Sequence, residues 1–94
     1  MEAQFTLVEK EDVGTFVFPH EVVLKTEEES KLLKNQLDRA ISLGNLEHQK
    51  VRIYFEDAKK KMVVETTIWA VTDTSIVLKQ NSIIPINRIY KLEI

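Results

Sequence analysis

Cysteine is absent from this sequence of 94 residues, and glycine and proline occur only twice each. The absence of cysteine excludes disulfides, a thiol nucleophile and metal–thiolate sites. Because secreted domains of this size usually depend on disulfides, the composition favours a reducing compartment, and we expect a cytoplasmic protein. So little glycine and proline leaves few positions for linkers, and we therefore expect residues 1–94 to form a single domain.

Long apolar runs are missing as well. The longest uninterrupted runs contain three or four residues, whereas a membrane-spanning helix needs about 20. The first residues, from Met1 to Gln4, form neither a basic segment nor an apolar one, so we expect no signal peptide. These features predict a protein without a membrane segment.

Groups that could carry out catalysis are few. His20 and His48 are the only histidines, and each stands beside a glutamate whose side chain would point to the opposite face of an extended chain. We interpret both as solvated; the alternative, a metal site that combines them with a carboxylate, has no supporting spacing. Gly14 and Gly44 stand alone, so there is no glycine-rich phosphate loop. We therefore expect no catalytic residue, cofactor, metal ion or small-molecule substrate, and we rank a small enzyme last among the candidate functions.

The clearest local pattern predicts a helix over residues 26–44. Thr26 and Glu29 have the spacing of a capping box, in which each side chain accepts a hydrogen bond from a free backbone N–H group of the first turn. The acidic run Glu27–Glu29 places negative charge at the positive end of the helix dipole. Gly44 can adopt the left-handed conformation that ends many helices. One face of the segment is apolar at helical spacing, at Leu33, Leu37, Ala40 and Ile41.

Beyond the helix, residues 50–94 alternate between apolar and polar side chains in short runs separated by turn residues. Residues 61–71 form the longest run and are apolar at both odd and even positions, as a strongly bent strand needs when it serves two sides of a small barrel. We therefore predict an α+β fold in which one helix precedes a five-stranded, strongly bent antiparallel sheet. The expected strands begin near Val51, Lys61, Ser75, Ser82 and Tyr90.

Residues 1–25 precede the helix and have the composition of extended chain. Around Leu7, apolar and polar residues alternate, and Thr15–Phe18 consists of β-branched and aromatic residues. After Pro19, residues His20–Leu24 again have the composition of a strand. We expect two or three short strands in this part, which would extend or cover the main sheet.

Three segments resemble the Sm-like family. Val51–Asp57 is similar to the first strand and acidic turn of that family, Ile68–Leu78 to its second strand, turn and third strand, and Ile84–Ile89 to the short strand and helical turn that close Sm-like and SH3-like barrels. The resemblance covers about residues 26–94 and implies that the five strands curl into a small barrel. Among Sm-like proteins, the bacterial RNA chaperone binds RNA and the Rho-binding antiterminator binds a protein. The resemblance thus implies a non-catalytic binding function and leaves the ligand open.

An RNA-binding function would use the basic second half of the chain. Residues 1–49 carry ten acidic and five basic side chains, a net −5, whereas residues 50–94 carry five acidic and eight basic ones, a net +3. This difference fits an anionic partner or attraction between the two halves of the fold, and we favour the second. Asn87 and Arg88 stand where the Sm-like RNA chaperone has a lysine and a histidine. The candidate contacts with RNA or a partner are Lys59, Lys60, Lys61, Arg52, Tyr54, Asn87 and Arg88. In a barrel we expect Lys50 and Arg52 to flank the lysine run, and Trp69 could be a further stacking surface.

Protein association is the function that we rank first, ahead of RNA binding. A small open barrel leaves its outer strands unpaired, and an unpaired strand edge can bind another chain. We expect these edges at Ser82–Pro85 and Tyr90–Ile94, with Ile84 and Tyr90 in the interface. The partner would be another protein or a second copy of the chain, and the simplest assembly is a dimer.

Overall fold

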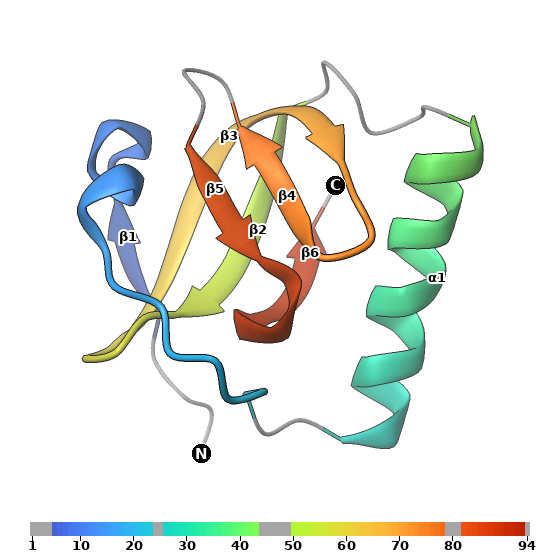
Figure 1. Ribbon diagram of the computed structural model, residues 1–94, viewed down its shortest axis with the longest axis horizontal. Helices are drawn as coiled ribbons and strands as arrows, with labels where there is room; N and C mark the ends of the chain where they lie inside the picture. Colours follow the sequence, from blue (N-terminus) through green and yellow to red (C-terminus); the bar gives the residue numbers. More distant parts are fainter. Residues whose placement is uncertain (1–4, 24–25, 44–49, 79–81, 94) are drawn as a thin grey trace.

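The computed structural model of the protein describes residues 5–23, 26–43, 50–78 and 82–93 (Figure 1). It has an α+β architecture with one long helix and one six-stranded sheet. In chain order the elements are β1 (Thr6–Val8), the 3-10 helix η1 (Lys10–Thr15), α1 (Glu27–Leu43), β2 (Lys50–Glu56), β3 (Lys61–Val71), β4 (Ser75–Leu78), β5 (Ile83–Pro85), the 3-10 turn η3 (Ile86–Arg88) and β6 (Ile89–Glu93).

The strand order shows how the five predicted strands are assembled. They follow the order β5-β4-β3-β2-β6, and each neighbouring pair along this path is antiparallel. β3 is long enough to pair with β2 over Lys61–Thr67 and with β4 over Ile68–Val71. A register shift between Ile68 and Ala70 interrupts the pairing with β4. The five strands are thus present, and the long one connects the two halves of the sheet.

A sixth strand comes from the N-terminal segment. β1 pairs in parallel with the beginning of β3, with Thr6 opposite Met62 and Val8 opposite Val64. Parallel pairing requires a long connection between the two strands, which η1, α1 and β2 supply here. The five strands that were predicted to be antiparallel are antiparallel, and the extra N-terminal strand adds one parallel pair.

The strands predicted at Thr15–Phe18 and His20–Leu24 are absent from the described part of the chain. Residues 16–23 instead run as an extended segment, which we call the strap. Its backbone binds other elements at isolated points; for example, Ala58 N–H donates to Val17 O at 2.9 Å. Such bonds satisfy the polar groups of an extended chain without a strand ladder.

The core is built mainly from the strands and is completed by the strap and the helix. Phe16 and Phe18 of the strap lie with their ring centres 6.2 and 5.9 Å from that of Phe55. The helix contributes Leu33 and Leu37 from its predicted apolar face. The buried core further contains Val13, Val51, Ile53, Met62, Val64, Ile68, Ile76, Leu78, Ile84, Ile89 and Leu92.

Helix α1 begins at the predicted cap. Thr26 Oγ1 accepts a hydrogen bond from Glu29 N–H at 3.1 Å, and Glu29 Oε1 accepts one from Thr26 N–H at 2.8 Å, which confirms the capping box. The helix contacts β6, where Gln36 Nε2 donates to Leu92 O at 3.2 Å. Gly44, the predicted end of the helix, lies outside the described residues. No helix in the described ranges is long and apolar enough to cross a membrane.

We expect Leu37→Ala to destabilise the protein more than Thr26→Ala does. Thr26→Ala removes a cap hydrogen bond at an exposed helix end, which should lower the free energy of unfolding by about 1 kcal/mol. Leu37 is buried, so its truncation leaves a cavity and should cost roughly 2–5 kcal/mol. Urea denaturation followed by circular dichroism measures both losses. Equal, small losses would contradict the docking of α1 through its leucines.

Candidate functional site

Arg88 joins three segments of the chain. Its Nε donates to Glu56 O at 3.0 Å, its Nη1 to Glu21 O at 2.6 Å and its Nη2 to Asp57 O at 3.3 Å. The residue is only 7% exposed. Removing a guanidinium from water is costly unless its N–H groups find acceptors, and these carbonyls provide them. Arg88 therefore ties the strap to the end of β2 and to the turn that follows it.

Asn87 holds the strap at neighbouring points. Its Nδ2 donates to His20 O at 2.6 Å, and its carbonyl accepts a hydrogen bond from Val23 N–H at 2.9 Å. Asn87 and Arg88 thus both donate to the backbone of the strap, and Arg88 also donates to that of Glu56 and Asp57. This placement argues against the prediction that the two residues contact RNA, because Arg88 is buried and both side chains bind backbone carbonyl groups of the protein.

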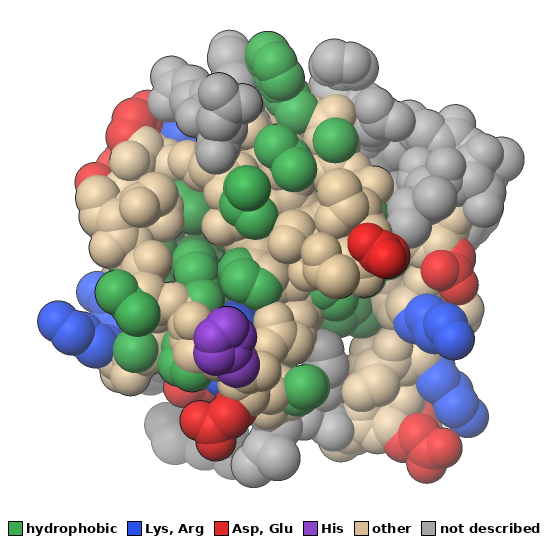
Figure 2. All heavy atoms as spheres, in the orientation of Figure 1, with side chains coloured by type: hydrophobic (Ala, Val, Ile, Leu, Met, Phe, Trp, Pro, Cys, Tyr) green, Lys and Arg blue, Asp and Glu red, His purple; other side chains and the backbone are tan. Residues whose placement is uncertain are grey.

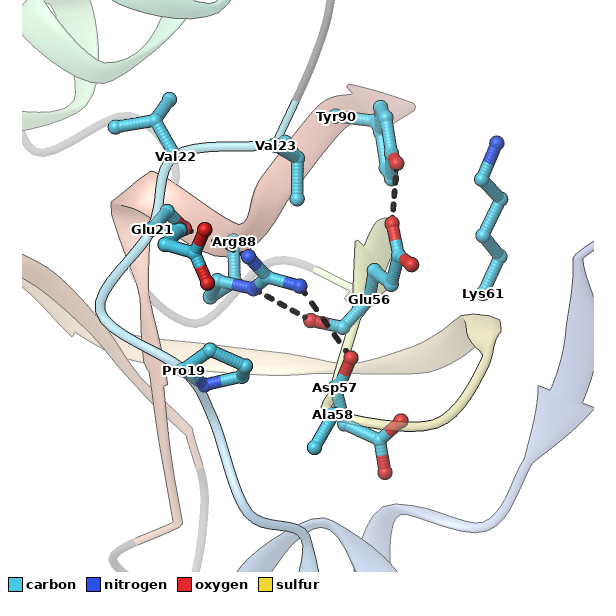
Figure 3. A pocket seen from close by; sticks show the side chains of 10 residues that line it. All are labelled: Pro19, Glu21, Val22, Val23, Glu56, Asp57, Ala58, Lys61, Arg88 and Tyr90. Atoms are coloured by element: carbon cyan, nitrogen blue, oxygen red, sulfur yellow. Dashed lines mark hydrogen bonds between the residues drawn. The ribbon is translucent and has the colours of Figure 1, made fainter.

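A groove opens beside Arg88, between the strap and the ends of β2, β3 and β6 (Figure 3). Its volume is about 500 Å³. The strap forms one wall of this Arg88 groove, and side chains from the three strands form the other. The lining residues that matter below are Pro19, Val22, Val23, Glu56, Ala58, Lys61 and Tyr90.

Tyr90, which we predicted at the edge of the sheet, contributes to the strand-side wall of the groove. Its hydroxyl donates to Glu56 Oε1 at 2.5 Å, and Lys61 Nζ lies 5.2 Å from the centre of its ring. Burial and the hydrogen bond to the Glu56 carboxylate raise the pKa of Tyr90 to about 12. The phenol is therefore a neutral donor at physiological pH, and its ring offers the lysine a cation–π partner.

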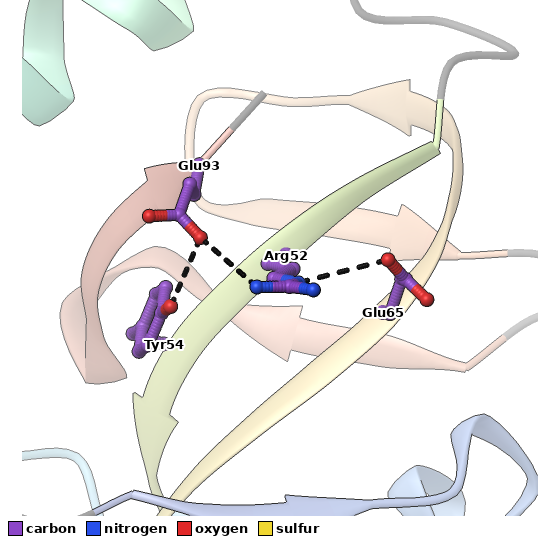
Figure 4. A network of polar contacts seen from close by, with 4 residues as sticks. All are labelled: Arg52, Tyr54, Glu65 and Glu93. Atoms are coloured by element: carbon purple, nitrogen blue, oxygen red, sulfur yellow. Dashed lines mark hydrogen bonds and ion pairs between the residues drawn. The ribbon is translucent and has the colours of Figure 1, made fainter.

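A second tyrosine has similar partners on the outer face of β2 and β6 (Figure 4). Tyr54 OH donates to Glu93 Oε1 at 3.1 Å, and Lys91 Nζ lies 4.7 Å from the centre of its ring. Arg52 lies between Glu65 and Glu93, at 3.6 and 3.5 Å. The two carboxylates, Glu65 first, raise the pKa of the Arg52 guanidinium. Arg52 and Tyr54, both candidate partner contacts, are thus engaged with neighbours on their own sheet.

Phe5 links the two tyrosines. Its ring centre lies 5.1 Å from that of Tyr54 and 5.5 Å from that of Tyr90, edge to face in both cases. The chain therefore crosses this face just before β1. The charged groups of this face nearly balance, which gives it only a weak attraction for phosphates. Four are basic and three acidic, a net charge of +1: Lys50, Arg52, Lys61 and Lys91 against Glu56, Glu65 and Glu93.

The lysine run lies in the turn between β2 and β3. Asp57 Oδ1 accepts hydrogen bonds from the backbone N–H groups of Lys59 and Lys60, both at 2.8 Å, which fixes the turn. Both lysines are exposed. Lys50 and Arg52 belong to the opposite end of β2, roughly 20 Å away by the rise of a strand. The prediction that they flank the lysine run is therefore wrong.

The outer face of β3, β4 and β5 is apolar. Ala70 lies opposite Val77 and Val77 opposite Ile83, so these side chains form one row across three strands. The register shift in β3 places Trp69 beside Ala70. Trp69 is 48% exposed and Ile83 50%, and β4 and β5 contain no charged residue. Figure 2 shows hydrophobic side chains gathered on this part of the surface. We call Trp69, Ala70, Val77 and Ile83 the apolar row.

The two predicted edge strands, β5 and β6, do lie at the ends of the strand order. The predicted interface residue Ile84 is nevertheless fully buried, because side chains alternate along a strand and its neighbour Ile83 takes the outer face. Both edges also have neighbours. Helix α1 contacts β6, and η1 lies beside β5, where a Cβ added at Gly14 would be 3.7 Å from Ser82 Oγ. The edges are therefore less open than we predicted.

Two sets of surface residues were not predicted from the sequence. In the apolar row, Val77 and Ile83 were missed because β4 and β5 are apolar at nearly every position, which hides the face that each side chain takes. In the groove, Pro19 and Val22 have no local signal at all. They line the same groove as Tyr90 because Arg88 binds the strap.

Among the residues that the structure describes, no histidine belongs to a metal site. His20 is an exposed residue of the strap, and His48 lies outside the described residues. Within the part of the chain that the structure describes, no three histidine, aspartate or glutamate side chains are grouped so that they could hold a metal ion. No known protein family, curated protein or solved structure matches this chain. The surfaces themselves are therefore the guide to function.

Arg88→Lys should destabilise the protein strongly, whereas Arg52→Lys should leave the urea midpoint nearly unchanged. A lysine cannot reach three separate carbonyl groups, so Arg88→Lys leaves buried acceptors unpaired and should lower the free energy of unfolding by about 3 kcal/mol. Arg52 is an exposed ion-pair residue, which solvent screens. Similar urea midpoints for Arg88→Lys and the parent would contradict the anchoring role.

The ionisation of Tyr90 should make stability depend on pH in the alkaline range. The chain has two tyrosines, so Tyr54→Phe isolates the absorbance of Tyr90, and its titration midpoint should lie near 12, above the ordinary value of 10.0. Because the pKa is raised in the folded state, the stabilisation is complete below pH 10 and is lost as the pH rises through about 12. Tyr90→Phe should remove this loss. A midpoint near 10 in the folded variant would contradict the burial and hydrogen bonding of Tyr90.

Proposed function

We propose that this protein is a non-catalytic protein-association module that forms a homodimer through the apolar row. The observation that carries the proposal is the half-exposed Trp69 and Ile83 at the two ends of a row that crosses three strands. Contiguous exposed apolar side chains are uncommon on monomeric proteins, and where they occur they often mark an interaction site. Tryptophan in particular is enriched where proteins bind one another.

The absence of charge on β4 and β5 favours a second copy as the partner. In a two-fold dimer the same patch meets itself, so a charged residue close to the two-fold axis would face its own copy and a like charge. The apolar row can meet itself without that cost. The row is roughly 10 Å wide from Ala70 to Ile83 by strand spacing, narrower than a standard interface, so we expect a weak dimer.

The neighbours of β5 and β6 favour the face of the sheet over its edges. A strand added beside β5 would compete with η1, and one added beside β6 would compete with α1. The apolar row has no such cover in the described part of the chain. Association through the face also leaves the hydrogen bonds of the sheet unchanged.

We extend the proposal to the fold itself, as an Sm-like curl of the five strands β2 to β6. It is supported by the order β5-β4-β3-β2-β6, in which the last strand lies beside the first, and by the division of β3 between β2 and β4. The 3-10 turn η3 stands between β5 and β6, where the resemblance implies a helical turn.

RNA binding is less well supported than protein association. Arg88 is buried, and Asn87 binds the strap. The tyrosine face has a net charge of only +1, and the outer face of β3 to β5 has no basic group on β4 or β5. Phosphate binding depends on clustered basic side chains that face the ligand.

Sedimentation equilibrium over increasing protein concentration tests the association. We expect the parent protein to dimerise at high micromolar concentration and Trp69→Glu or Ile83→Glu to prevent it, because each places a charge in the interface. The matched control is Leu32→Glu on α1, where the wild-type leucine is 55% exposed, close to the exposure of the row residues. This control should dimerise like the parent. A parent that stays monomeric, or equal loss of dimer in the control, would contradict the proposal.

A further inference from the structure

Strand β1 forms a third edge of the sheet, in addition to β5 and β6. It pairs with β3 on one side, and no other strand among the described residues pairs with it. Apart from this pairing, the backbone groups of Thr6–Val8 form no hydrogen bond within the described part of the chain. Thr6 and Leu7 are exposed, and Figure 1 shows β1 at the margin of the sheet. The outer side of β1 is therefore open to another strand.

The residues of β1 do not protect this edge. Natural proteins often place a charged residue or a proline on an exposed edge strand, whereas Thr6, Leu7 and Val8 are uncharged. Leu7 lies opposite Val63, which lies opposite Tyr54, so Leu7 belongs to the tyrosine face. Its side chain is 71% exposed. An added strand would thus gain an apolar contact as well as backbone hydrogen bonds.

The two ends of β1 carry opposite charges. The β2–β3 turn lies at its start, because Thr6 is opposite Met62. Residues 57–61 contain three lysines and one aspartate, a net +2, and residues 9–12, which follow β1, contain three acidic side chains and one lysine, a net −2. Figure 2 shows both groups on one margin of the molecule, the acidic one over η1 and the basic one at the turn. Neither group forms an ion pair within the described ranges.

From these observations we propose that β1 pairs antiparallel with β1 of a second copy of the chain. A two-fold axis at Leu7 places Leu7 of one copy opposite Leu7 of the other, so no like charges meet at the axis. The same rotation brings the basic turn of each copy beside the acidic segment of the other. A parallel pair of strands would instead bring like charges together at both ends.

Glu9 is the acidic residue best placed for this contact. Its backbone is extended, with φ −79° and ψ 142°, so the alternation of β1 continues and Glu9 takes the same face as Leu7. In the proposed register, Glu9 of one copy lies opposite Phe5 of the other. Continuing the pairing of β1 with β3 places Lys61 beside Phe5, about 10 Å from that glutamate by two strand spacings. The two long side chains can span this separation.

This edge interface is separate from the apolar row and does not depend on it. Because β1 has only three residues, few hydrogen bonds form and the interface is small, so we expect association at millimolar concentration, weaker than that of the row. A second copy suits the edge better than an unrelated protein does, because the charges at its two ends complement each other when two identical edges meet. A chain with both interfaces would link its dimers into larger assemblies.

Sedimentation equilibrium at millimolar concentration tests the edge interface in the Trp69→Glu variant, in which the apolar row is blocked. We expect this variant to dimerise, and the added substitution Leu7→Lys to weaken the dimer about tenfold, because two lysines then meet at the axis. The matched control is Val17→Lys on the strap, where the wild-type valine is also 71% exposed. This control should change the dissociation constant by less than about twofold.

Charge reversal tests the register in the same Trp69→Glu variant. Lys59→Glu with Lys60→Glu makes both ends of β1 acidic, and Glu9→Lys with Glu11→Lys makes both ends basic. Each pair of substitutions should weaken self-association about tenfold, because like charges then meet at both ends. An equal mixture of the two variants should dimerise, and all four substitutions in one chain should restore the dimer.

Several outcomes would overturn the pairing of β1 with a second copy. One is a Trp69→Glu variant that stays monomeric at millimolar concentration. Another is equal weakening by Leu7→Lys and Val17→Lys, and a third is failure of the two charge-reversed variants to associate when mixed. If the chain stays monomeric while an uncharged extended peptide shifts the amide resonances of Thr6–Val8, the edge instead accepts a strand of another protein. With the row blocked throughout, these results are independent of the proposed dimer.

Discussion

Strand β3 is the element on which the other parts of the fold depend. Its 11 residues pair with β2 on one side and, on the other side, with β1 near the start and β4 near the end. Side chains of both parities are buried at Met62, Val63 and Val64. The register shift that separates the two stretches also leaves Trp69 exposed beside Ala70. The geometry that lets one strand serve two halves of the sheet thus produces the apolar row.

Arg88 has a comparable role at the other surface. One buried guanidinium binds carbonyl groups from the strap, the end of β2 and the turn. Because the bonds go to backbone atoms, they fix the path of the chain and do not depend on the identity of the residues that accept them. The cost of burying the charge is offset by these hydrogen bonds. The neighbouring phenol of Tyr90 adds a pH-dependent contribution to the same region.

The three surfaces of this small protein differ in how their charges are paired. On the outer face of β2 and β6, each tyrosine has a carboxylate at its hydroxyl and a lysine over its ring, so the charges there are satisfied internally. The lysine turn is different, because Asp57 binds its backbone and leaves the ammonium groups without partners in the described part of the chain. The outer face of β4 and β5 carries no charge at all. Different ligands therefore suit the turn and the apolar row.

The sequence by itself determined the elements whose information is local. The capping box of Thr26 and Glu29, the apolar helix face at Leu33 and Leu37, and the positions of the five later strands depend on neighbours a few residues apart, and all are found in the structure. Only the tertiary structure decided what lies at long range. Four features depend on contacts between segments far apart in the chain. They are the parallel pairing of β1, the burial of Arg88, the distance of Lys50 and Arg52 from the lysine turn, and the exposure of Ile83 instead of Ile84. Such contacts leave no periodic pattern in the sequence, because every residue has a backbone carbonyl group and its presence does not show which side chain it will bind.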